Sequence, residues 1–148
     1  MIRTILQLCA DSIAPALLFS VFSEVPIALS SATSQTRNAT LGRALRFCVV
    51  GCVAIAVPVV LAELGKKYEI WHGHPGFPSG HTTFAASASA VIVTYRGKHW
   101  LLLCAPATVV MMCSLVLLRY HTPVEVLGGL VLGAVLATLI TRSLMPRE

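Results

Sequence analysis

Long apolar stretches separated by short polar links dominate this chain. A helix that crosses a bilayer needs about 20 mostly apolar residues, within a range of about 17–25. Stretches of this kind predict five helices, at residues 12–31, 45–64, 77–95, 100–118 and 124–140. The first stretch is the weakest, because Pro15, Glu24 and Pro26 interrupt it and favour a broken or interfacial helix.

The composition indicates a membrane protein. Of the 148 residues, 56% are hydrophobic and 11% are charged, and the mean hydropathy is +0.81. A soluble domain usually carries about 25% charged residues. Since this chain has too few charges to cover a surface that faces water, we predict an all-α, integral-membrane helix bundle of about five transmembrane helices.

The distribution of positive charge predicts the orientation in the membrane. The net charge is +5, from 11 Lys and Arg against 6 Asp and Glu. Five crossings would put the N-terminus and the links 66–80 and 119–123 on one side with four Lys or Arg, against seven on the other side. Cytoplasmic loops carry the excess of positive charge. We therefore expect the histidine-rich links to face the periplasm or the cell exterior, from a bacterial inner (plasma) membrane.

Other polar and small residues support narrower expectations. No basic run is interleaved with aromatic residues, so we expect no nucleic acid partner, and the oligomeric state stays open. Gly129 and Gly133 predict close packing between helices of one chain in preference to a dimer face. Glu24 is expected to pair with Arg43 or Arg46 near the cytoplasmic side.

Three polar clusters fall at helix ends on the side predicted to face outward. Lys67 is followed by His74-Pro75, the run Pro78-Ser79-Gly80-His81 opens the third apolar segment, and His121 precedes Glu125 at the start of the fifth. Polar groups at membrane depth are costly unless they line a site. The predicted topology brings these helix ends together, so we expect the rings of His81 and His121 to converge on one anion-sized site.

These clusters resemble the motifs of the type 2 phosphatidic acid phosphatase superfamily, whose members are membrane lipid phosphatases related to vanadium haloperoxidases. The family motifs read Lys, six residues and Arg-Pro; then Pro-Ser-Gly-His; then Ser-Arg, five residues, His, three residues and Asp. The second motif is intact here, and the others match in spacing. The length and the apolar content predict that residues 1–148 form a single membrane-embedded domain. Its motif-bearing core would cover about 45–140, and 1–44 would form an N-terminal apolar segment and a polar link.

The resemblance also implies a mechanism without a metal or other cofactor. His121 would attack phosphorus and form a phospho-histidine, and Glu125, on the same helical face, would orient the ring. His81 would protonate the leaving group and then activate water. Lys67, Ser79 and Gly80 would bind the phosphoryl oxygens, the two latter through backbone N–H groups and the serine also through its hydroxyl.

Three positions depart from the family pattern. His74 and Leu115 stand where the motifs have arginine, and Glu125 stands where they have aspartate. Hydrogen bonds to charged groups contribute about 1.5–3 kcal/mol each. The loss of two arginines would therefore slow the reaction by about 10²–10⁴-fold unless other cations compensate. Lys66, Arg119 and a protonated His74 are the candidates, and we count His74 and Arg119 among the expected phosphate-binding residues.

Alternatives remain open. The leading hypothesis is hydrolysis of a lipid-linked phosphate or diphosphate, such as undecaprenyl diphosphate, phosphatidic acid or phosphatidylglycerol phosphate. The second is a lipid phosphotransferase similar to sphingomyelin synthase, because relatives of that kind lack the same arginines. The third is a non-catalytic membrane protein that retains the fold. His72, His74 and His81 have a spacing too unspecific to predict a metal site, and Lys67 also fits an interfacial anchor.

Overall fold

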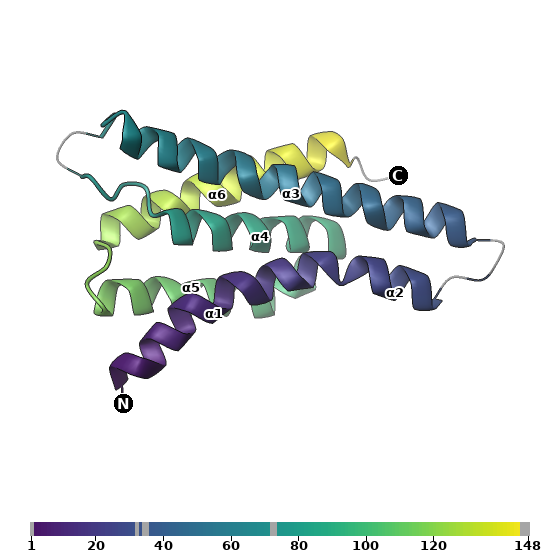
Figure 1. Cartoon of the computed structure of the whole chain (residues 1–148), viewed down its shortest axis with the longest axis horizontal. Helices are drawn as coiled ribbons and strands as arrows, with labels where there is room; N and C mark the ends of the chain where they lie inside the picture. The colour runs from purple at the N-terminus through teal and green to yellow at the C-terminus, as the bar shows by residue number, and fades with distance from the viewer. Residues whose placement is uncertain (1, 32, 34–35, 72–73, 146–148) are drawn as a thin grey trace.

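The computed structural model describes residues 2–31, 33, 36–71 and 74–145. Within these residues the chain forms a bundle of six α-helices, and one short 3-10 turn joins two of them (Figure 1). The helices are α1 (Ile2–Phe22), α2 (Glu24–Ser31), α3 (Arg37–Lys67), α4 (Gly80–Arg96), α5 (Leu101–Leu117) and α6 (Pro123–Leu144), and the turn η1 is Lys98–Trp100. No strand occurs in the described residues, which confirms the all-α prediction.

Most of these helices have the length and composition of membrane spans. Among the described residues, four helical segments are long and apolar enough to cross a membrane: Ile2–Ser30, Arg37–Lys67, Lys98–Leu117 and Pro123–Leu144. Helix α4 has 17 residues, at the lower limit for a span. It contacts α1, α3, α5 and α6 and lies in the middle of the bundle (Figure 1). These apolar helices indicate a membrane protein.

Small residues allow α4 and α6 to approach closely. A Cβ added at Gly129 would lie 2.6 Å from the carbonyl oxygen of Ser79, and one at Gly133 would collide with the carbonyl of Thr83. In lipid, helices associate through such close backbone contact, because apolar side chains gain little over lipid tails. The predicted packing of these two glycines within one chain is confirmed.

Two helix starts differ from the prediction. The first helix begins at Ile2 instead of residue 12, and α3 begins at Arg37 instead of residue 45. In both cases the polar residues that were expected to precede the helix lie inside it. Asp11 is an example, because it lies inside α1 with an exposed side chain. The expected interruption of the first segment is present between α1 and α2.

The predicted partner of Glu24 was wrong. The Nε of Arg96 donates to the Glu24 carboxylate at 2.6 Å, and the same guanidinium donates to the Ser20 carbonyl at 2.9 Å and to the Ser23 hydroxyl at 3.0 Å. Arg96 ends α4, so it fastens the junction of α1 and α2 to the central helix. The break between α1 and α2 places these acceptors around one guanidinium, and the local sequence carries no sign of that arrangement.

Candidate active site

His81 and His121, which the sequence predicts to be catalytic, lie at one end of the bundle. At this end α3 and α5 end and α4 and α6 begin (Figure 1). We call this end the site end. His81 lies in the first turn of α4, and His121 lies in the link before α6. Their ring centroids are 6.3 Å apart, with an angle of 59° between the rings. The expected convergence of the two imidazoles is confirmed, whereas their catalytic roles stay predictions.

Local helix chemistry holds Glu125 beside His121. Thr122 caps α6, because its hydroxyl accepts from the Glu125 N–H at 3.4 Å while its own N–H donates to the Glu125 Oε2 at 3.0 Å. The same Oε2 lies 3.0 Å from the Nδ1 of His121. The carboxylate is buried and fixes the ring through Nδ1. Nε2 is therefore the nitrogen left for reaction chemistry.

A glycine that sequence reasoning missed covers this carboxylate. A Cβ at Gly76 would lie 2.8 Å from three atoms of the Glu125 carboxyl group, so the loop before α4 packs directly on it. Real Cβ atoms do not approach so closely, and any larger residue would displace the carboxylate. The only available signal was a glycine placed between Pro75 and Phe77-Pro78.

The structure corrects the expectation for Ser79. Its hydroxyl accepts from the N–H of Thr82 at 3.4 Å and from the Thr82 hydroxyl at 3.3 Å, and the residue is fully buried. Its backbone N–H donates to the Glu125 carbonyl at 2.9 Å. Ser79 thus caps α4 and ties it to α6, so its amide is already engaged and is not available to a phosphate. Gly80, the first residue of α4, borders the site, and its phosphate-binding role stays a prediction.

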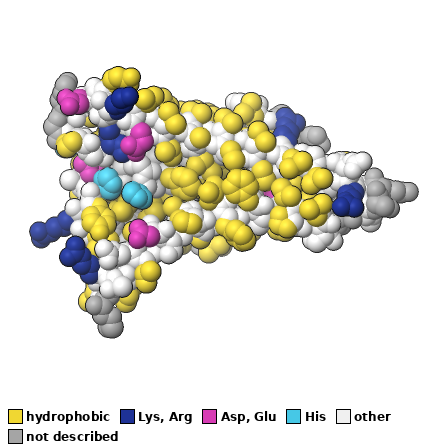
Figure 2. All heavy atoms as spheres, viewed as in Figure 1, with side chains coloured by type: hydrophobic (Ala, Val, Ile, Leu, Met, Phe, Trp, Pro, Cys, Tyr) yellow, Lys and Arg dark blue, Asp and Glu magenta, His cyan; other side chains and the backbone are white. Residues whose placement is uncertain are grey.

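A groove of about 510 Å³ contains both histidines, and we call it the histidine groove. Its polar end consists of Glu63, Lys66, Gly80, His81 and His121. Its apolar wall comes from α1, α3 and α4, through Ala14, Pro15, Leu18, Val59 and Phe84. Figure 2 shows histidine side chains at the surface, next to a long field of hydrophobic side chains and near acidic and basic groups. The groove therefore joins a charged end to an apolar surface.

The expected phosphate-binding cations are distributed differently from the prediction. Lys67 is exposed, and its Nζ lies 5.8 Å from the centre of the Tyr68 ring. Arg119 is exposed and has a left-handed backbone, with a φ of 60°. Neither is among the residues that line the histidine groove, whereas Lys66 is. Lys67 and Arg119 were expected to bind the phosphate, but the structure places neither of them in the lining of the histidine groove.

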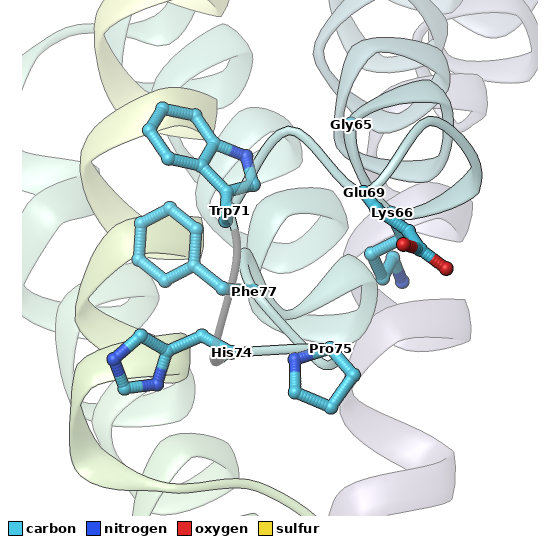
Figure 3. A pocket seen from close by; sticks show the side chains of 7 residues that line it. All are labelled: Gly65, Lys66, Glu69, Trp71, His74, Pro75 and Phe77. Atoms are coloured by element: carbon cyan, nitrogen blue, oxygen red, sulfur yellow. The ribbon is translucent and has the colours of Figure 1, made fainter.

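His74 lies in a second, smaller cavity of about 240 Å³, which we call the loop cavity. Figure 3 shows His74, Trp71 and Phe77 along one side of this cavity and Lys66 with Glu69 on the other. The Trp71 and Phe77 rings meet edge to face at 5.1 Å. His74 does not line the histidine groove, although Lys66 borders both cavities.

His72 lies outside the described residues. Among the described residues, no group of three or more His, Cys, Asp or Glu side chains is arranged to hold a metal ion. Leu115, at the position of a motif arginine, is buried in the apolar core.

Comparison with known proteins now defines the class. Residues 32–148 match the PAP2 superfamily, and the chain belongs to it. Neither the search of curated proteins nor the search of solved structures found a match. Members of the superfamily are generally phosphatases, which indicates a phosphatase-type activity on phosphorylated substrates. The match begins after α2, yet α1 supplies part of the apolar wall of the histidine groove.

Proposed function

We propose that this protein hydrolyses a lipid-linked phosphate or diphosphate through a phospho-histidine formed on His121, without a metal ion. The observation that carries the proposal is the pair of imidazole rings, 6.3 Å apart, at the polar end of a groove whose remaining wall is apolar. A substrate with a charged phosphate and a long apolar chain matches both parts of this groove. Undecaprenyl diphosphate, phosphatidic acid and phosphatidylglycerol phosphate are of this type.

The reaction proceeds in two balanced steps. The Nε2 of His121 attacks phosphorus, the bond from phosphorus to the leaving oxygen breaks, and His81 donates a proton to that oxygen. In the second step, the oxygen of a water molecule attacks phosphorus, and the water gives a proton to His81. The phosphorus–nitrogen bond breaks, and phosphate leaves. Glu125 orients His121 through Nδ1 and stabilises the positive charge that the ring develops in the first step.

The groove also suggests how a lipid reaches the histidines. Its apolar wall runs over α1, α3 and α4 toward the middle of the bundle, so a lipid chain would lie along it while the phosphate stays at the site end. The substrate would then move in sideways from the adjacent leaflet. The excess of positive charge at the other end of the bundle supports a site that faces the periplasm or exterior of a bacterial inner membrane.

One assay tests the proposal. The purified chain in detergent receives a panel of lipid phosphates in the presence of EDTA, and released phosphate is measured. His121→Ala and His81→Ala should abolish release, whereas His99→Ala should not. His99 is a suitable control because it lies in η1, at the other end of the bundle. Release that persists in His121→Ala, or that requires a divalent metal, would refute the proposed mechanism.

A specific observation supports transfer of a phospho-headgroup between lipids as a second candidate. Among the described residues that line the histidine groove, Lys66 is the only Lys or Arg, and it pairs with Glu63. Such a weakly positive site suits a phosphodiester, which carries one negative charge, better than a phosphomonoester with two. Headgroup exchange between labelled lipids without release of phosphate would support this candidate. Absence of both reactions, in the wild type as in His121→Ala, would indicate a non-catalytic protein.

A further inference from the structure

Two adjacent lysines end α3, and their side chains lie in different surroundings. The Nζ of Lys67 lies near the Tyr68 ring, outside the histidine groove. Lys66 borders both the histidine groove and the loop cavity, and 22% of its side chain is exposed. Its Nζ lies 2.5 Å from the Glu63 carboxylate.

We propose that Lys66 is the cation that binds the phosphate of the substrate, and that Glu63 competes with the phosphate for it and thereby selects for a phosphate of low charge. This inference rests on the proposed function, since it concerns the same groove. It assigns to Lys66 the role that the motif spacing assigns to Lys67. It also adds an acidic residue that the family motifs do not include.

The pair lies against the beginning of α4. A Cβ at Gly80 would collide with the Glu63 carboxylate and would lie 3.5 Å from the Lys66 Nζ. Gly80 directly precedes His81, and the Lys66 and His81 side chains line the same groove. Backbone N–H groups at a helix start favour an anion there as well. A phosphate bound by Lys66 is therefore within the region in which His81 and His121 act.

In the Glu63–Lys66 pair, a phosphate can replace the carboxylate as the partner of the lysine. The two residues are one helical turn apart on α3, and 57% of the Glu63 side chain is exposed. An exposed ion pair of this kind is weak, because water and salt screen it. A phosphate, which offers several acceptor oxygens, can replace the carboxylate on the ammonium. Glu63 then remains close to the phosphate, and its charge repels a dianion more strongly than a monoanion.

The test uses two soluble probes that differ in charge. At pH 8 methyl phosphate is a dianion and dimethyl phosphate is a monoanion. Binding of each is measured from the thermal stabilisation of the purified chain in detergent, for the wild type, Lys66→Met, Lys67→Met and Glu63→Gln. The melting temperature without a probe is recorded for every variant, so that a loss of folding is recognised. Lys67→Met is the matched control, because it removes the same charge one residue away.

We expect the wild type to bind dimethyl phosphate more tightly than methyl phosphate. Lys66→Met should weaken both by about tenfold or more, and Lys67→Met should leave both unchanged. Glu63→Gln should tighten methyl phosphate by about three- to tenfold and dimethyl phosphate less. Equal effects of the two lysine variants, an unchanged preference in Glu63→Gln, or no binding of either probe to the wild type would overturn the inference.

The binding results and the turnover results are independent. If the probes follow the expected pattern while no lipid phosphate is hydrolysed, the proposed function fails and the assignment of Lys66 and Glu63 stands. If lipid phosphates are hydrolysed through His121 while the probes ignore Lys66, the assignment fails and the proposed function stands.

Discussion

Replacement of Glu125 by aspartate, the residue of the family motif, is expected to reduce activity. Removal of one methylene shortens the side chain by about 1.5 Å, the length of one carbon–carbon bond. The distance from the carboxylate to the Nδ1 of His121 is 3.0 Å, as is the distance to the Thr122 N–H. In Glu125→Asp both would open to about 4.5 Å, beyond the range of a hydrogen bond.

The size of the effect follows from the lost contact. A hydrogen bond to a charged group contributes about 1.5–3 kcal/mol, and about 1.4 kcal/mol corresponds to a tenfold change in rate. We therefore expect the kcat of Glu125→Asp to fall by about 10- to 150-fold in the phosphate-release assay. The KM should change less, because the carboxylate contacts His121, the proposed nucleophile, and does not line the histidine groove.

Two controls make this result interpretable. Glu125→Gln keeps the length of the side chain and removes its charge, so it separates the reach of the residue from its charge. The melting temperature of each variant in detergent shows whether the bundle remains folded. A Glu125→Asp variant that is folded and as active as the wild type, or more active, would contradict the geometry described for this site.

Three further substitutions test other contacts. Gly76→Ala should displace the Glu125 carboxylate and lower kcat by about tenfold or more, whereas Gly42→Ala, where a Cβ meets nothing within 4 Å, should leave phosphate release unchanged; equal activities would be inconsistent with the packing. Gly129→Ala should lower the free energy of unfolding by about 1–3 kcal/mol, measured by denaturation in detergent, and stability like that of Gly42→Ala would refute the close contact of α4 and α6. Arg96→Lys should lower the melting temperature and preserve kcat, because it loses contacts to the junction of α1 and α2, at the end of α4 opposite His81. A large loss of kcat without a loss of stability would reveal a role in the site.

The sequence by itself determined the fold class and much of the helix plan. The segments predicted at 100–118 and 124–140 correspond to α5 and α6 within a few residues. Long apolar runs have few alternatives in lipid, because only helices satisfy every backbone N–H and C=O there without partners from other segments. The spacing of His121 and Glu125 also predicted their contact, but the expected reason, a shared helical face, was wrong. His121 lies before the first turn of α6, and the capping box at Thr122 turns the Glu125 carboxylate toward it.

The tertiary structure decided which polar side chains share the groove. Lys66 and Lys67 have the same side chain, but adjacent helical residues point about 100° apart. Only the packing of α3 shows which of the two lines the groove with the histidines. The backbone N–H of Ser79 donates to the Glu125 carbonyl in α6 and is not left for a ligand. Gly76 and the wall from α1 come from segments far away in the chain. Hydrophobic periodicity specifies which stretches are helical and cannot specify such contacts, because these depend on how separate helices pack.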